Sequence, residues 1–151
     1  HTFYGGIPQY FIYGIKGCWE FTAGKYEEAL QSKLIAYNSD VAKEYISIQM
    51  ADILNNLKRH KEALTYFNVD VLEKINDYYE HDVLKSALNQ IHHAQIELNN
   101  QDICDDVELM ISSCHSDIIK KTYVTIKQEH NNLPNNSSPI KRALTGCKSS
   151  T

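Results

Sequence analysis

The sequence predicts an all-α fold, a stack of about three antiparallel helical hairpins that ends in a C-terminal capping helix. The first observation behind this prediction is an internal repeat, because residues 28–30 (Glu-Ala-Leu) return as residues 62–64, a spacing of 62 − 28 = 34 residues. The second is that apolar residues recur at helical spacing through most of the chain. A repeat of this length is typical of a helix-turn-helix unit, which cannot bury its apolar face alone and stacks on its neighbours.

The first hairpin is predicted over residues 9–37. Apolar residues are dense between positions 9 and 22, too dense for an alternating strand, and Gly24 follows as a terminator. We therefore expect a helix over residues 9–22 that is buried on most sides. A second helix is expected over residues 27–37, where Leu30, Leu34 and Tyr37 fall on one stripe.

The second hairpin is predicted over residues 39–75. Ser39 or Asp40 is expected to cap its first helix, because short polar side chains accept hydrogen bonds from the first helical turn. Residues 58–60 form the expected turn. The apolar spacing after this turn predicts one return helix that reaches Ile75.

The third hairpin is predicted from its turn, because residues 98–101 align with residues 57–60. The step is 98 − 57 = 41 residues, seven more than the first repeat. Seven residues are about two helical turns, so the insertion is expected to lengthen the hairpin and preserve its stacking phase. Helices are expected over residues 82–98 and 102–114, the second with Asp102 as its N-cap.

A capping helix is expected over residues 117–130, with Ser116 as its N-cap and one polar side, as the end of a stack requires. From residue 131 the chain is rich in Asn, Ser and Pro, and no periodic apolar pattern resumes. We expect residues 1–130 to form the repeat domain and residues 131–151 a flexible polar tail. Ser138 in this tail begins a Ser-Pro-x-Lys pattern and is a candidate phosphorylation site.

Composition disfavours several functions. Fifteen Lys and Arg against nineteen Asp and Glu give a net charge of −4, and the helical region has no dense basic run, so binding to nucleic acid or an anionic membrane is disfavoured. No stretch approaches the roughly 18 apolar residues of a membrane span. Four cysteines without a CxxC motif predict free thiols in a reducing compartment, and we expect a cytoplasmic protein.

No arrangement of residues predicts catalysis or metal binding. An enzyme would need a nucleophile with a positioned base or a pair of carboxylates in a pocket, and neither is recognisable, so we expect no enzymatic activity. His92 and His93, with Cys104, Cys114 and His115, have metal-ligating chemistry. Adjacent residues on a helix point about 100° apart, and no His pair is spaced by four residues, so we expect no metal and no cofactor.

These features resemble the tetratricopeptide repeat family over roughly residues 9–130. The matching positions are Gly17, Gly24, Tyr26, Ala29 and Ala36 in the first unit, Ala51, Ala63 and Phe67 in the second, and Leu88, Ile91 and Cys104 in the third. The longer step before the third unit is similar to the extended repeats of kinesin light chains, cell-polarity scaffolds and bacterial peptide-sensing regulators. The resemblance implies a right-handed solenoid that binds a peptide or a partner helix in a groove lined by the first helix of each pair.

The repeat phase of the resembled family also implies which residues face this groove. The set is aromatic at one end and rich in amides at the other, and comprises Phe11, Ile15, Cys18, Tyr45, Ile48, Gln49, Asp52, Asn56, Ser86, Asn89, Gln90, His93 and Glu97. Asn and Gln carry both a donor and an acceptor, so they can pair with the backbone of an extended peptide. The alternative is that surface helices of an Asn-rich chain simply carry many amides. The candidate peptide- or partner-binding residues are Tyr45, Gln49, Asp52, Asn56, Ser86, Asn89, Gln90 and His93.

We therefore expect a non-catalytic interaction module or scaffold that binds a protein or peptide, and neither nucleic acid nor a membrane. The predicted face lacks a Lys/Arg cluster, which argues against capture of a terminal carboxylate. One alternative is a domain that senses a signalling peptide and controls an effector domain outside this chain. Another is a structural or dimerisation role, which exposed apolar residues on the first helix, Tyr10 and Phe11 above all, would favour. The sequence predicts no oligomeric state.

Overall fold

A computed structural model describes residues 3–4 and 7–132 of the chain. Within these residues the fold is all-helical apart from two short antiparallel strands, β1 (Phe3–Tyr4) and β2 (Ile7–Pro8). The eight helices of the described residues are α1 (Gln9–Thr22), α2 (Tyr26–Tyr37), α3 (Lys43–Asn56), α4 (His60–Leu64), α5 (Val69–Tyr78), α6 (His81–Leu98), α7 (Gln101–Ser112) and α8 (Asp117–Asn131). The prediction of an all-α fold is confirmed.

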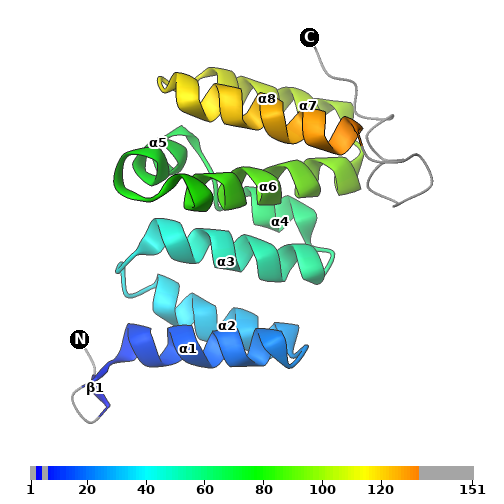
Figure 1. The fold of residues 1–151 in the computed structure, drawn as a ribbon. Coiled ribbons are helices and arrows are strands. Elements are labelled where there is room, and N and C mark those ends of the chain that lie inside the picture. Colours follow the sequence, from blue (N-terminus) through cyan, green and yellow to red (C-terminus); the bar gives the residue numbers. More distant parts are fainter. Residues whose placement is uncertain (1–2, 5–6, 133–151) are drawn as a thin grey trace.

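The helices lie in successive layers along the molecule (Figure 1). In this view α1, α3 and α6 lie one above another, with α2 and α4 behind them. Most contacts join helices that are near in the chain: α1 packs on α2, α2 on α3, and α3 on both α4 and α6. The face shared by α3 and α6 therefore lies in the middle of the molecule.

The first hairpin has the predicted bounds within one residue. The turn between α1 and α2 contains Gly24 with φ +79°, a left-handed conformation that glycine adopts without steric cost. The burial of α1 was predicted wrongly, however, because Gly17 is its one buried residue. Phe11 and Trp19 are 51% and 73% exposed. The exposure follows from the position of α1 at the end of the described stack, where α2 covers one side of it.

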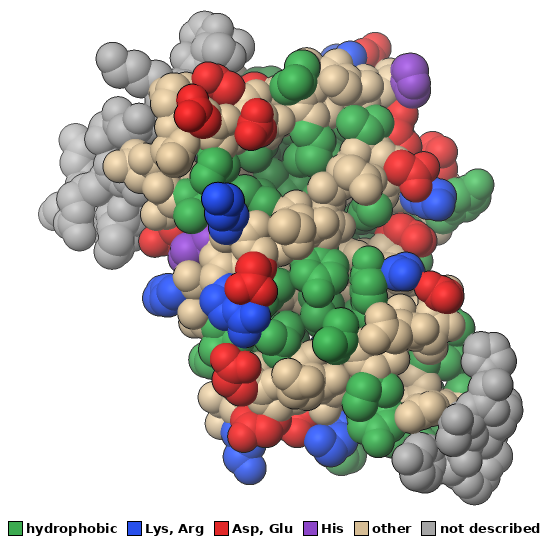
Figure 2. Space-filling view, turned by 180° about the vertical axis from the view of Figure 1, so that it is seen from behind, with side chains coloured by type: hydrophobic (Ala, Val, Ile, Leu, Met, Phe, Trp, Pro, Cys, Tyr) green, Lys and Arg blue, Asp and Glu red, His purple; other side chains and the backbone are tan. Residues whose placement is uncertain are grey.

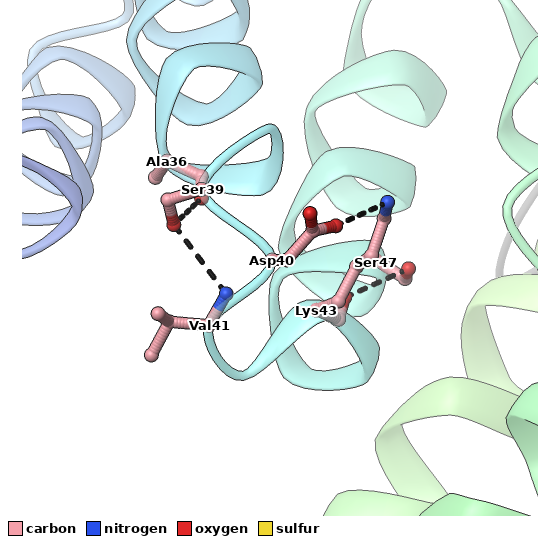
Figure 3. A network of polar contacts seen from close by, with 6 residues as sticks. All are labelled: Ala36, Ser39, Asp40, Val41, Lys43 and Ser47. Carbon is pink, nitrogen blue, oxygen red and sulfur yellow. Dashed lines mark hydrogen bonds and ion pairs between the residues drawn. The ribbon is translucent and has the colours of Figure 1, made fainter. Parts of the chain in front are cut away.

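The loop before α3 differs from its prediction, because neither Ser39 nor Asp40 caps that helix (Figure 3). The Ser39 hydroxyl donates to the backbone oxygen of Ala36 at 2.5 Å, and Lys43 Nζ pairs with the Asp40 carboxylate at 2.9 Å. The N-cap position is Ala42, with φ +49° and no side-chain hydrogen bond. These polar side chains close the end of α2 and the loop instead of the start of α3.

The return helix predicted up to Ile75 is two helices, α4 and α5. Asn68 causes the restart, because its side chain accepts a hydrogen bond from the N–H of Val71 at 2.8 Å and so caps α5. Residues 65–67 (Thr-Tyr-Phe) between the two helices are β-branched or aromatic and have modest helix propensity. The extra length expected in the hairpin is instead a separate helix that packs on α3, α6 and α8.

The third hairpin and the last helix match their predicted ranges within two residues. Asp102 is not the N-cap of α7, because Asn100 holds that position and accepts from the N–H of Ile103 at 3.2 Å. Ser116 caps α8 as predicted, accepting from the N–H of Ile118 at 3.2 Å. The sequence therefore predicted the ranges of these helices well, but only one of the two N-caps correctly.

The core is continuous and is concentrated away from α1. Ala29 and Ala63, which carry the internal repeat, are 0% and 1% exposed. The largest fully buried side chains come from α3, α5, α6 and α8: Met50, Ile53, Leu54, Leu72, Ile75, Leu84, Leu88, Ile91, Ile96, Ile119, Tyr123 and Ile126. Small residues at the repeat positions let neighbouring helices approach closely, and the large side chains fill the layers between them.

The cysteines only partly follow their prediction. Cys18 and Cys114 carry free thiols, but Cys104 is disulfide-bonded, so the free-thiol prediction is wrong for that residue. Cys147, the candidate phosphorylation site Ser138 and nearly all of the predicted tail lie outside the described residues. None of the described helices combines the length and the apolar character needed to cross a membrane. A cytoplasmic location stays a prediction.

Candidate functional site

Two pockets lie along α3 and α6 and together contain all eight predicted binding residues. The polar pocket, of about 400 Å³, is lined by Asp52, Asn55, Asn56, Lys58, Asn89, Gln90, His93 and His130. The tyrosine pocket, of about 240 Å³, is lined by Tyr45, Ile48, Gln49, Asp82, Val83 and Ser86. Five of the predicted residues line the first pocket and three line the second, so the structure brings the set together on one face.

The two pockets are built by the same helix positions, displaced by seven residues. Each residue of the tyrosine pocket has a counterpart seven positions later in the polar pocket: Tyr45 and Asp52, Ile48 and Asn55, Gln49 and Asn56, Asp82 and Asn89, Val83 and Gln90, Ser86 and His93. Seven residues are nearly two complete helical turns, about 10.5 Å along the axis. The pockets are therefore equivalent positions in one row, with different side chains.

The floor of the polar pocket is held by Asn55, which the sequence analysis missed. Asn55 is 3% exposed, and its Nδ2 donates to Gln90 Oε1 at 2.8 Å and to the Gln90 backbone oxygen at 3.2 Å. Its Oδ1 lies 2.8 Å from Nδ1 of His60. Asn55 thus joins α3 to α6 and α4 and fixes the shape of the pocket. Nothing in the sequence distinguishes this buried asparagine from the many exposed asparagines of the chain.

Asp52 supplies the carboxylate of the polar pocket. Burial raises the pKa of Asp52, an effect opposed by the side chain of Gln90, by the charge of His93 and by Asn56. Asn56 Nδ2 donates to Asp52 Oδ1 at 3.2 Å and to its backbone oxygen at 2.8 Å. No Lys or Arg in the described part of the chain forms an ion pair with Asp52. This carboxylate is therefore partly desolvated and has only amides and a histidine beside it.

Burial disfavours the charged forms of two histidines near the polar pocket, His60 and His130. Burial lowers the pKa of His60, which is buried behind Asn55, and the pKa of His130, which lines the pocket from α8. The ring of His60 meets that of His93 edge to face, with 5.6 Å between their centres. Lys58 is the cationic side chain in the lining, and it is exposed. It was absent from the predicted groove set because it lies in the turn after α3.

The tyrosine pocket has a mainly apolar floor. Ile48 is buried, and the ring of Tyr45 stacks on Tyr79 of the chain segment after α5, with 6.3 Å between ring centres. Val83 is half-buried, and Asp82 lies beside it as an exposed residue. A pocket with this lining suits an aliphatic or aromatic side chain of a ligand.

Gln49, a predicted contact residue, is already occupied by a neighbour. Its Oε1 accepts from Nζ of Lys33, which is 3% exposed and also donates to the Gly14 backbone oxygen and to Cys18 Sγ, at 2.8 and 3.1 Å. Lys33 therefore ties α2 to α1 and α3. Lys33 was not among the residues predicted from the sequence, although a lysine at an inward position of α2 was visible as a break in an apolar stripe.

The outer members of the predicted groove do not line either pocket. Phe11, Ile15 and Cys18 are exposed on α1, one layer away, and Glu97 lies near the end of α6. The described face is therefore shorter than the groove implied by the resemblance. It consists of α3 and α6, with Lys58 and His130 at one end.

His92, adjacent to His93, points into the core instead of the face. It is 1% exposed, its ring centre is 4.5 Å from that of His130, and its Nδ1 lies 3.5 Å from the Tyr123 hydroxyl and from Gln95 Nε2. Burial lowers the pKa of His92 to about 3. His92 Nε2, Gln95 Oε1 and His130 Nδ1 have no hydrogen-bond partner among the described residues. No group of three His, Cys, Asp or Glu side chains in this part of the chain could hold a metal ion.

The opposite side of the molecule carries a third, apolar pocket. Leu64, Ile103, Val107 and Met110 of α4 and α7 line it with Lys61, Thr65 and Asp106, and its volume is about 250 Å³. Figure 2, which views this side, shows hydrophobic side chains along the middle of the molecule between charged ones. None of the predicted binding residues belongs to this pocket.

The α3/α6 face thus combines amides, one partly buried carboxylate and an apolar pocket at a regular spacing. Its side chains can bind by hydrogen bonds, charge and apolar contact. Comparisons of the chain with protein-family models, curated proteins and solved structures found no match.

Proposed function

We propose that this chain is a non-catalytic interaction module of the tetratricopeptide kind that binds an extended peptide segment of a partner protein along the α3/α6 face. One observation carries the proposal: the residues chosen from the repeat phase line two pockets that are related by a seven-residue shift on both helices. A row of equivalent positions suits a ligand that is itself a linear chain of equivalent units.

The chemistry of the face supports a peptide ligand. Asn89 is exposed and offers a donor and an acceptor to the backbone of an extended peptide, and the exposed Asn56 offers its Oδ1 as an acceptor while its Nδ2 donates to Asp52. The pockets between these amides can take side chains, so affinity and specificity have separate sources. The net charge of −4 argues against nucleic acid as the ligand.

The arrangement of hairpins supports the tetratricopeptide part of the proposal. Ala29 and Ala63, which are 34 residues apart, occupy equivalent buried positions on the second helix of successive hairpins, α2 and α4. The α3 and α6 helices, the first helices of two successive hairpins, supply the proposed binding face, as the family resemblance implies.

A structural role is the second candidate, and the exposed side of α1 favours it. Phe11, Ile15 and Trp19 follow one another at four-residue spacing, and all three are exposed. In this candidate function α1 packs against another part of a larger assembly. Tyr10, named with Phe11 as an indicator of this role, is half-buried and adds no support.

The test is a peptide selection followed by a double substitution. Short peptides selected from a randomised displayed library would be titrated by calorimetry against the wild-type chain and the Asn56→Ala/Asn89→Ala variant. Losing two peptide hydrogen bonds should weaken binding by about tenfold or more, because each contributes about 0.5–1.5 kcal/mol.

The control is the Gln31→Ala/Gln128→Ala variant, which removes two exposed amides that line neither pocket. It should keep both the affinity and the melting temperature. Equal affinities for both double variants would place the peptide elsewhere, and a failure to select any peptide would favour the structural role of α1.

A further inference from the structure

We propose that the α3/α6 face selects peptides in which a basic side chain, Lys or Arg, lies three residues from an apolar one, with the basic group at Asp52 and the apolar group in the tyrosine pocket. This inference rests on the proposed function and adds the chemical class of the ligand. It is carried by the different lining of two equivalent pockets.

The polar pocket favours a cation because its partly buried charge is negative. Asp52 is half-buried, its neighbours are Asn56, Gln90 and His93, and no described Lys or Arg pairs with it. A carboxylate that has lost part of its hydration gains more from an incoming cation than a fully solvated one does. A positively charged side chain of a ligand is therefore favoured beside Asp52.

An anionic ligand is disfavoured in the same pocket. Lys58 is the charged group that would attract it, but this side chain is exposed, and exposed ion pairs contribute little. His60 and His130 are held towards their neutral forms by burial, which lowers the pKa of each. An anion would also lie beside the carboxylate of Asp52.

The tyrosine pocket favours an apolar side chain. Its lining includes the buried Ile48, the half-buried Val83 and the Tyr45 ring, which is 43% exposed and stacked on Tyr79. An apolar side chain that covers Tyr45 and Val83 removes apolar surface from water on both sides. Asp82, which is exposed in the same lining, disfavours an acidic group there.

The distance between the pockets sets the spacing in the ligand. Seven residues separate Tyr45 from Asp52, about 10.5 Å along the helix. A polyproline II segment has three residues per turn and rises about 3.1 Å per residue, so side chains three apart point the same way at about 9.3 Å. In a β-strand the side chains on one face are about 6.6 or 13 Å apart, which fits less well. The ligand spacing is therefore three residues.

The experiment measures binding of short peptides on a Ser/Gln background by fluorescence anisotropy at fixed salt. Peptides with Lys-x-x-Leu and Leu-x-x-Lys, which cover both chain directions, would be compared with peptides in which Lys is replaced by Glu or by the neutral norleucine. Peptides with Lys-x-Leu test the spacing. We expect the better Lys peptide to bind about tenfold more tightly than its norleucine form.

Charge variants locate the preference. Asp52→Asn should abolish the preference for Lys over norleucine, and Asp52→Lys should reverse it in favour of Glu. Asp102→Asn, at an exposed acid on α7, is the control and should leave the preference intact. Circular dichroism melting of each variant verifies that it is folded. If Asp52→Lys does not fold, Asp52→Asn, which has nearly the same side-chain shape as the wild type, still tests the preference.

The outcomes separate this inference from the proposed function. Peptides that bind through Asn56 and Asn89 without any preference for Lys would overturn the inference and leave the proposed function standing. A Lys preference that persists in Asp52→Asn would also overturn it, because the cation would then lie elsewhere. If no peptide binds in a way that depends on Asn56 and Asn89, both proposals fail.

Discussion

The buried imidazole of His92 makes the stability of this fold depend on pH. Burial holds the pKa of His92 at about 3, against 6.5 in an unfolded chain. Between these two values the unfolded state binds a proton that the folded state does not, so stability is lost as the pH falls through this window. His60 and His130 have lowered pKa values as well and act in the same direction.

We predict that acidification destabilises the wild-type chain more than a His92→Leu variant. From pH 7 to about pH 4.5 the contribution of His92 is on the order of 2–3 kcal/mol, because the unfolded-state pKa lies about two units above the final pH. Urea unfolding at both pH values measures the difference. His81→Leu, which removes an exposed histidine from the same helix, is the control. The same loss of stability in wild type and His92→Leu would show that His92 does not carry the effect.

Ala63 tests the repeat at the scale of one side chain. It is 1% exposed on α4, which packs on α3 and α6. Ala63→Glu should destabilise the fold by about 3 kcal/mol or more, because it buries a charge without a partner and has no space for the added atoms. Thr65→Glu adds the same charge at an exposed position just after α4 and should change little. Circular dichroism would decide, and a Ala63→Glu chain as stable as the control would refute the repeat phase.

The α1 helix offers a matched pair of glycines for the element scale. A Cβ at Gly17 would lie 2.9 Å from Lys33 Cγ, whereas a Cβ at Gly14 would meet nothing within 4 Å. Gly14→Ala should stabilise the chain by up to about 1 kcal/mol through helix propensity. Gly17→Ala should destabilise it by about 1 kcal/mol, because displacing the buried Lys33 side chain costs more than the propensity gains. Thermal unfolding of the two variants gives the comparison, and a stabilising Gly17→Ala would show that Lys33 moves without cost.

The helices themselves were largely predictable, and the misses have physical causes. Helical periodicity and Gly24 were enough for α1 and α2, because both signals are local. The break at Asn68 was not predicted because the apolar spacing continues across it. The capping hydrogen bond to Val71 forms with the backbone of Asn68 in an extended conformation, which the apolar spacing does not reveal. Asp40 was a reasonable cap by composition, yet its carboxylate pairs with Lys43 instead.

The sequence predicted which residues share the α3/α6 face, but not the hydrogen bonds among them. The repeat phase placed Asn56, Asn89 and the other candidates on one face because helical geometry alone fixes which residues share a face. It could not assign Asn55 to the pocket floor, since that depends on a hydrogen bond to Gln90 from another hairpin. Whether an amide is free or already paired is set by tertiary contacts.

Across the whole molecule, the uneven core predicts uneven protection from hydrogen exchange. The large, fully buried side chains lie on α3, α5, α6 and α8, whereas α1 has Gly17 as its one buried residue. Amides of α1 should therefore exchange at least about tenfold faster than those of α6, since elements with few buried contacts open locally at lower free energy. Hydrogen–deuterium exchange with mass spectrometry measures this. Equal protection of α1 and α6 would indicate that the chain opens as one unit.

A single substitution in the centre extends this test. Leu88 is 0% exposed on α6, so Leu88→Ala should lower the free energy of unfolding by about 2–5 kcal/mol. It should also speed hydrogen exchange in the helices that pack on α6, which are α3, α4, α5, α7 and α8. Gly17→Ala should speed exchange in α1 and α2 and near the contact of Lys33 with Gln49 of α3, but not in α8, because α1 packs on α2 and Lys33 joins α2 to α3. A variant-independent exchange pattern would argue against coupling between neighbouring layers.

In the proposed function, the length of α3 would limit how many residues of a peptide the α3/α6 face can contact. This helix has 14 residues, two periods of seven, and each period contributes one pocket. The α6 helix has 18 residues and continues past the polar pocket, but α3 ends at Asn56 and supplies no partner for that extension. The number of side chains that the proposed peptide could place in pockets would thus be limited by the end of α3 at Asn56. Inserting a further seven residues into α3 is the change that would add a third pocket position to this helix.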